Sequence, residues 1–168
     1  MNIKPICLCL VKLGDKGLEI VKNYPNALPD EVLSQISIKS MPLNAKDGDF
    51  ISTNINNNYL SGYVFTTPST KGRGGIASLV AIFNTMQYNT EIIKKVFSFT
   101  ITELRKNDLV SVDVISEILP KLYTGLTNEM LKIKISSVVT LEFDFKEKQE
   151  EKDGKKILIE DIKKDVWS

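Results

Sequence analysis

The chain has 168 residues, of which 42% are hydrophobic and 26% are charged, and its formal net charge is +1. This length is sufficient for one folded domain with its own core, and the near-zero charge gives no sign of a nucleic-acid or anionic-membrane partner. The sequence contains no histidine, so catalytic triads of the Ser-His or Cys-His kind are excluded.

Residues 5–13, "PICLCLVKL", are apolar on both faces and predict a strand in the middle of a sheet. Cys7 and Cys9 share one face of this strand, and we interpret them as buried, reduced thiols. A redox pair or half of a zinc site is the alternative, but zinc needs four ligands and the chain has two cysteines. Because the apolar run is short, we expect no signal peptide and a cytoplasmic protein.

A tight turn at 14–17, "GDKG", joins this strand to an alternating second strand at 18–24. A helix is predicted over 27–41, with Pro29 at its first helical position. One face of that helix carries the apolar residues at helical spacing, which are Leu28, Val32, Leu33 and Ile36.

Two further strands are predicted on either side of the "NNN" turn at 56–58. Residues 50–55, "FISTNI", are half polar and predict an edge strand, and residues 59–67 return from it. In the preceding "KDGDF", Asp47 and Asp49 could form a carboxylate pair for acid–base chemistry or a cation, but the further oxygen ligands of a calcium loop are missing. We therefore interpret them as turn residues.

The glycine-rich stretch 68–75, "PSTKGRGG", places a lysine and an arginine among three glycines, as a phosphate-binding loop does. A Walker loop needs the spacing G-x-x-x-x-G-K-[ST] and a following helix, whereas residues 76–83, "IASLVAIF", predict a buried strand. The stretch is therefore interpreted as a hairpin loop. The alternative function is a small-molecule-sensing, anion-sensing or enzymatic domain that uses the loop Lys71–Gly75.

The hydrophobic period changes to that of a helix over 89–108, and a second helix is predicted over 110–126. Pro120 is expected to kink or end this second helix, and Gly125 to close it. The remaining segment 129–168 is rich in charge, yet seven of its apolar residues all occupy odd positions, namely Leu131, Ile133, Ile135, Val139, Leu141, Phe143 and Phe145. That alternation predicts a strand. Residues 146–156, "KEKQEEKDGKK", are interpreted as a solvated connection and residues 157–162, "ILIEDI", as a short return strand, so the extension is either an appended hairpin or one strand and a tail.

The order of these elements and their burial predict an α+β fold. The two strands that are apolar on both faces belong in the interior of the sheet, and the half-polar strands belong at its edges. A five-stranded antiparallel sheet in the order 2-1-5-4-3 meets this requirement, with one helix on one face and two on the other. We expect residues 1–128 to form this domain and 129–168 to form a charged extension with a strand.

The arrangement resembles the longin domain over residues 6 to about 126. "GLEIVKNYP" is similar to the second strand of that family, "YLSGYVFTTPS" and "IASLVAIF" to its fourth and fifth strands, and "ISIKSMP" with "GDF" to its helix exit and third-strand entry. The layered sheet is longin/profilin-like, but the roadblock domain and profilin open with helices, whereas this chain opens with a hairpin. The richness in Ile, Lys and Asn favours an archaeal relative.

The resemblance implies a non-enzymatic protein-binding module. Longin domains occur in SNAREs, adaptor subunits, the TRAPP complexes and Mon1–Ccz1. Their shared work is protein binding, by dimerisation and often by presenting a platform to a small GTPase. This chain has no heptad coiled coil after the domain, so it looks more like the adaptor or GTPase-platform branch. The implied partners are a second copy, another longin- or roadblock-type protein, and a small GTPase of vesicle trafficking. No catalytic, cofactor-binding or metal-binding residue is expected.

In family dimers the first helix and third strand meet the partner. On this sequence the resemblance places there the residues Val32, Gln35, Ile36, Lys39, Ile51, Thr53 and Ile55. The edge strand independently permits it, because no charge or proline lies between Ile51 and Ile55 to prevent pairing with another strand. The alternative is that the C-terminal strand of the chain itself covers this edge.

Overall fold

The computed structural model describes residues 4–15, 17–42, 44–68, 75–135 and 138–144. Along the chain the elements are β1 (Cys7–Gly14), β2 (Gly17–Tyr24), α1 (Asp30–Lys39), β3 (Phe50–Ile55), β4 (Asn58–Thr67), β5 (Gly75–Phe83), α2 (Thr90–Lys106), α3 (Val112–Asn128), β6 (Met130–Lys134) and β7 (Thr140–Asp144). The fold is α+β, as the sequence predicts.

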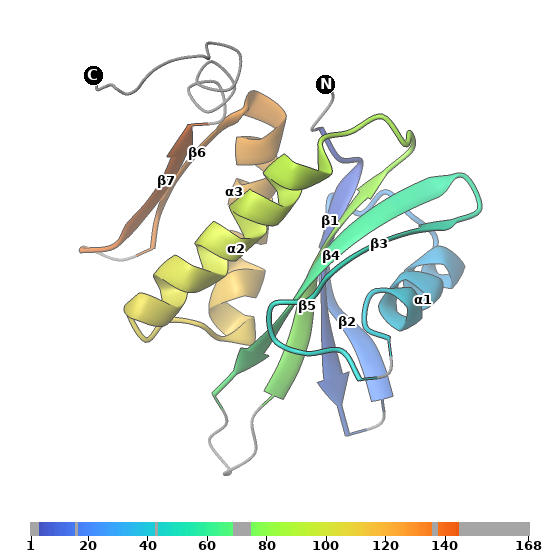
Figure 1. Ribbon diagram of the computed structural model, residues 1–168, viewed down its shortest axis with the longest axis horizontal. Coiled ribbons are helices and arrows are strands. Elements are labelled where there is room, and N and C mark those ends of the chain that lie inside the picture. The colour runs from blue at the N-terminus through green and yellow to red at the C-terminus, as the bar shows by residue number, and fades with distance from the viewer. Residues whose placement is uncertain (1–3, 16, 43, 69–74, 136–137, 145–168) are drawn as a thin grey trace.

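Strands β1 to β5 form one antiparallel sheet in the order β2-β1-β5-β4-β3. The predicted order is therefore confirmed, with β1 and β5 inside and β2 and β3 at the edges. The physical reason is burial, since residues 7–11 of β1 and 77–83 of β5 are inaccessible to solvent on both faces. Figure 1 shows α1 on one side of this sheet and α2 with α3 on the other.

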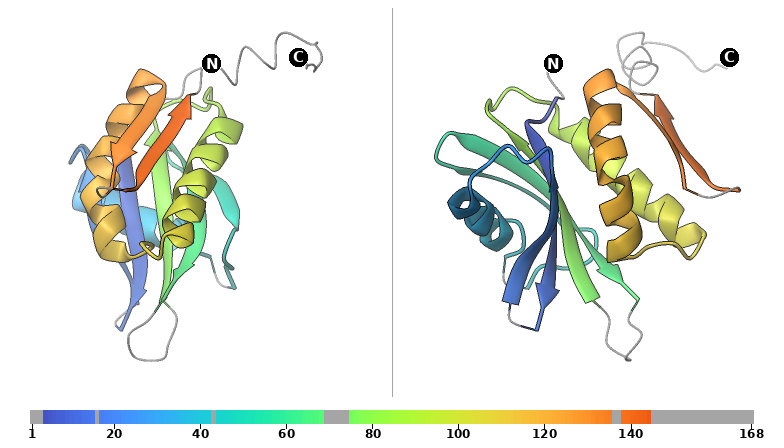
Figure 2. Two further views of the ribbon diagram at one scale, coloured as in Figure 1. Left: turned by 90° about the vertical axis from the view of Figure 1, so that its left-hand side faces the viewer. Right: turned by 180° about the vertical axis from the view of Figure 1, so that it is seen from behind.

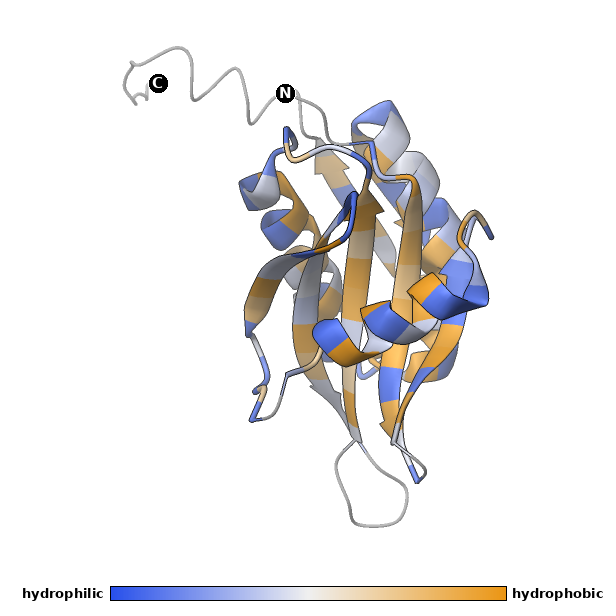
Figure 3. Cartoon of the chain, turned by 90° about the vertical axis from the view of Figure 1, so that its right-hand side faces the viewer, coloured by the Kyte–Doolittle hydropathy of each residue, from blue (hydrophilic) through white to orange (hydrophobic). Residues whose placement is uncertain are grey.

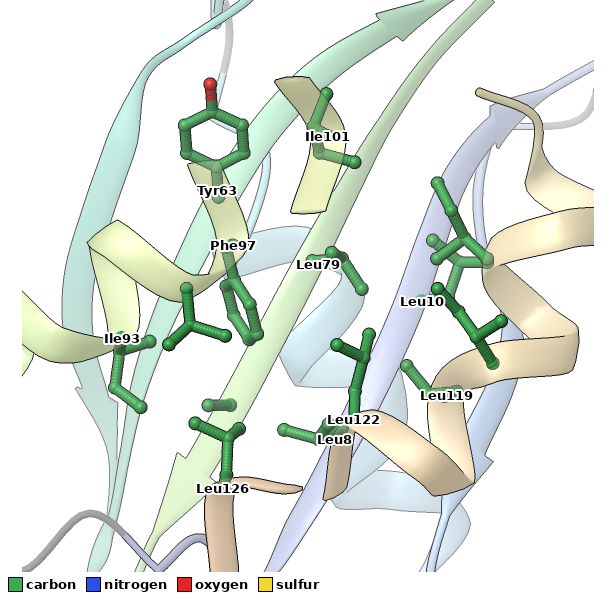
Figure 4. Close-up of a cluster of buried hydrophobic side chains, with 14 of the residues drawn as sticks. Leu8, Leu10, Tyr63, Leu79, Ile93, Phe97, Ile101, Leu119, Leu122 and Leu126 are labelled. Carbon is green, nitrogen blue, oxygen red and sulfur yellow. The ribbon is translucent and has the colours of Figure 1, made fainter. Parts of the chain in front are cut away.

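The larger core lies between the sheet and the helices α2 and α3. Figure 4 shows side chains from all three converging: the sheet contributes Leu8, Leu10, Tyr63 and Leu79, α2 contributes Ile93, Phe97 and Ile101, and α3 contributes Leu119, Leu122 and Leu126. The side chains of one face of each strand meet the apolar stripe of each helix, so burial and local periodicity agree.

The smaller core lies under α1, on the other face of the sheet. Leu33 and Ile36 of α1 contact the face of β1 that carries Cys7 and Cys9, and both cysteines are free and fully buried. Figure 3 looks onto this side and shows α1 crossing in front of largely hydrophobic strands. Pro29 is the residue before the helix rather than its first residue, which is a shift of one position from the prediction.

Helix α3 continues through Pro120 to Asn128, so Pro120 does not end it, and the predicted closure at Gly125 is three residues too early. Proline removes one backbone donor, but the residues around it, Leu119 and Leu122, are fully buried against the sheet. This packing outweighs the lost hydrogen bond. The helix ends instead at Glu129, whose backbone is left-handed with φ of 58°.

The C-terminal strands β6 and β7 pair only with each other among the described residues, so the predicted C-terminal hairpin extension is present. Its strands differ from the prediction, because both lie within 130–144, whereas the predicted return strand at 157–162 lies outside the described residues. Figure 2 shows this hairpin on the outer side of α2 and α3, away from the large sheet. Leu131, Ile133 and Leu141 point into the core that these helices share with the sheet. No helix in the described part of the chain is long and apolar enough to cross a membrane.

Candidate functional site

The outer edge of β3 is the main candidate for an interaction site. Within the described ranges β3 pairs with β4 on one side and with no strand on the other. Val64 donates its N–H to the carbonyl of Asp49, so in this antiparallel ladder the odd-numbered residues of β3 bond to β4. The N–H and C=O groups of Ser52 and Asn54 consequently point outward, away from β4.

The two edges of the sheet differ in how well they resist pairing. The edge strand β2 carries Glu19 and Lys22, and Glu19 forms an ion pair with Lys12 at 3.3 Å. The partner strand β1 also carries an irregularity between Leu10 and Val11. Charges and bulges are the usual protection of an edge, and β3 between Ile51 and Ile55 has no charged residue. The β3 edge is therefore the better docking edge.

The side chains predicted for this surface do not all reach it. On β3, Ile51 and Thr53 are half-buried, but Ile55 is only 5% exposed and belongs to the core under α1. The expectation that Ile55 faces a partner therefore does not hold for its side chain. Because side chains alternate along a strand, Ile51, Thr53 and Ile55 all lie on the α1 side of the sheet, and Ile55 is buried in the core there.

The predicted interface residues of α1 likewise include both buried and exposed side chains. Ile36 is fully buried and Val32 is half-buried against the same core, so the expectation of an exposed Ile36 does not hold. Gln35 and Lys39 are exposed, as expected. The sequence analysis missed Ile38, which is 66% exposed on the outward face. The sequence could have predicted its exposure, because Ile38 falls outside the helical stripe of the buried residues.

The C-terminal hairpin does not cover the β3 edge. Strands β6 and β7 lie against α2 and α3, and the part of the chain that the structure describes contains no other C-terminal strand. The alternative in which this hairpin caps the edge is therefore excluded for residues 130–144. The edge stays open on the described structure.

A chain of hydroxyl groups fixes β3 to the rest of the sheet. The Ser52 hydroxyl is 2.9 Å from that of Ser61, and Ser61 is 2.8 Å from the Tyr88 hydroxyl. The Tyr88 ring stacks on Phe83, with 3.8 Å between ring centroids. Ser61 is fully buried, so its two partners satisfy a polar group that would otherwise destabilise the fold.

The loop that leads into β3 is held by Asp47. Its carboxylate accepts hydrogen bonds from both terminal nitrogens of Arg105 on α2, at 3.2 and 2.7 Å, and from the Thr66 backbone N–H at 2.8 Å. The hydrogen bond from Arg105 and the bond from Thr66 lower the pKa of Asp47. Turn geometry does not account for Asp47; only Asp49 fits that interpretation, because it accepts the Lys46 backbone N–H at 2.8 Å.

Other groups with possible chemistry are not arranged for it. A hydrogen bond with Cys7 and burial both raise the pKa of the Cys9 thiol, so it stays protonated at neutral pH. Within the described residues no cluster of three or more acidic or sulfur ligands could hold a metal. Of the loop Lys71–Gly75, residues 71–74 lie outside the described residues, and Gly75 is the first residue of β5.

Comparison with known proteins gives no assignment. The chain matches no known family, and no curated protein is similar to it at a significant level. The case for a function therefore rests on the edge of β3, the outward face of α1 and the sheet topology.

Proposed function

We propose that this chain is a longin-like protein-interaction module, which uses the β3 edge and α1 to dimerise and to scaffold or regulate a small GTPase of a trafficking-type complex. The observation that carries the proposal is the uncharged outer edge of β3, with which no strand pairs in the described part of the chain. A second strand added there would gain main-chain hydrogen bonds at Ser52 and Asn54 and would continue the sheet into the partner.

The outward residues of α1 complete this surface. Ile38 supplies an exposed apolar contact, and Gln35 and Lys39 supply polar groups at its rim. Interfaces commonly combine an apolar centre with such a rim. The element order and the single helix on this face are also those of the longin fold, which supports the family assignment as part of the proposal.

The test uses Asn54→Pro. The Asn54 N–H points away from β4, so proline removes a donor from the free edge and leaves the β3–β4 ladder intact. Asn54→Ala is the matched control because it keeps the N–H. Asn54 is a better position than Ile55 for testing the edge. The side chain of Ile55 is buried, so replacing it with a charged residue would unfold the protein.

We expect the unaltered chain and Asn54→Ala to run as dimers in size-exclusion chromatography with light scattering, and Asn54→Pro to run as a folded monomer. For a heterodimer, affinity capture from the source cells would recover a small GTPase or a longin- or roadblock-type protein with the control but not with Asn54→Pro. Equal behaviour of the two variants in both assays would contradict the proposal.

A further inference from the structure

A groove on the far side of the molecule runs beside the free edge of β6. It has a volume of about 350 Å³, and its walls come from the last turns of α3 and the start of β6. Lys121, Thr124 and Asn128 line it from the helix, and Met130 and Lys132 line it from the strand. None of these residues belongs to the proposed interaction surface of β3 and α1.

The main chain of β6 is available along this groove. Ile135 donates its N–H to Val139, so odd-numbered residues of β6 bond to β7 and the N–H and C=O of Lys132 point away from it. The position of Met130 agrees, because its carbonyl oxygen would be 3.2 Å from a Cβ placed on Gly125 of α3. Within the described residues no strand pairs with this edge.

The charge of the groove selects its occupant. Lys121 and Lys132 both line it, and none of its lining residues carries a carboxylate. Lys121 has no ion-pair partner among the described residues, and Lys132 has only a loose pair with Glu142 at 3.9 Å between side chains that are 69% and 67% exposed. Such an exposed ion pair has little interaction free energy, so both ammonium groups remain available to a ligand.

We propose that this groove binds an extended, acidic segment of a partner protein, which adds to β6 as a third strand. The segment bonds to the N–H and C=O of Lys132, and a carboxylate on its outward face lies beside the Lys132 ammonium. Alternate residues face α3, over Pro120 and near Lys121, so a sequence that alternates acidic and apolar side chains fits best. The proposal does not depend on the β3 edge.

The experiment is an NMR titration of the full chain with a hexapeptide of alternating Glu and Val. We expect saturable shifts of the amide signals of Lys132, Lys134 and Lys121. The double variant Lys121→Glu, Lys132→Glu should weaken binding about tenfold, which is the worth of two exposed charge contacts. The double variant Lys94→Glu, Lys95→Glu, which makes the same charge change on the exposed face of α2, should leave binding unchanged.

Two further controls separate main-chain pairing from charge. A hexapeptide with alternate amides N-methylated keeps its carboxylates but loses its donors and should not bind. A hexapeptide of Lys and Val should not bind either. Asn54→Pro should bind the acidic peptide normally, so failure of the β3 proposal and failure of this one are distinguishable.

Several results would overturn the proposal. These are no binding of the acidic peptide, equal binding of the basic or N-methylated peptide, and equal affinity in the double variant. Carbodiimide treatment of the free chain that joins Lys121 or Lys132 to a carboxylate beyond residue 144 would overturn it too, because the groove would then hold the C-terminal residues of the chain itself.

Discussion

Gly125 is the point where α3 and the C-terminal hairpin come closest, and replacing it with alanine tests how tightly the hairpin is attached. A Cβ at this position would be 2.5 Å from Leu131 Cδ1, 3.2 Å from the Met130 carbonyl oxygen and 3.3 Å from Leu131 Cα. The first of these atoms ends a side chain that is fully buried, and the other two are backbone. Relief therefore requires β6 to move.

Two opposing effects set the size of the change. Glycine inside a helix costs about 1 kcal/mol relative to alanine, so Gly125→Ala gains that amount in helix propensity. Crowding a well-packed core costs about 1–3 kcal/mol. We expect a net destabilisation of about 1 kcal/mol, which is about 2–4 °C in the melting midpoint of a chain of this size.

The double-mutant cycle with Leu131→Ala separates these effects. Leu131→Ala alone should cost about 2–5 kcal/mol because it leaves a cavity. In that background Gly125→Ala should stabilise the protein, because the space needed by the new methyl group is free. Urea unfolding of the four proteins measures the coupling, expected at about 1–2 kcal/mol. A coupling near zero, or stabilisation by Gly125→Ala alone, would refute the close packing of hairpin and helix.

Two further predictions concern the supports of β3. Asp47→Asn should lower stability by less than about 1 kcal/mol at neutral pH, because the pair with Arg105 is 40% and 41% exposed. Folding lowers the pKa of Asp47, so the difference in stability between the unaltered chain and Asp47→Asn should be complete above about pH 5. It should vanish as the pH falls through that lowered pKa, and a difference that persists in acid would contradict the ion pair between Asp47 and Arg105 as its cause. Tyr88→Phe should cost about 1 kcal/mol in thermal unfolding by removing one partner of Ser61, and Ser61→Ala should cost no less; no loss in either variant would exclude the hydroxyl chain as a support.

Much of the fold could be predicted from local patterns. Residues 7–11 and 77–83 are apolar on both faces, and this placed β1 and β5 inside the sheet before any contact was known. The odd-numbered apolar residues from Leu131 onward predicted extended structure in the C-terminal segment, but not that this one segment would form both strands of the hairpin. Each of these signals lies within a few neighbouring residues.

Features that depend on distant residues could not be predicted. Asp47 meets Arg105 across 58 positions of sequence, and a turn motif alone explains an aspartate there equally well. Pro120 and Gly125 have local preferences that end a helix, but burial of their neighbours against the sheet overrides them. The burial of Ile36 and Ile55 likewise follows from how α1 sits on the sheet, which periodicity alone does not specify.

The placement of the hairpin changes how freely α2 and α3 can vary in sequence. In most two-layer folds a helix has one side that tolerates almost any polar residue. Here Phe97 of α2 faces the sheet while Phe99 contacts Phe143 of the hairpin, with 5.6 Å between ring centroids. In a mutational scan of folding stability, substitutions around most of the circumference of α2 and α3 should therefore destabilise the protein. Substitutions in α1, which is covered on one side only, should destabilise it least.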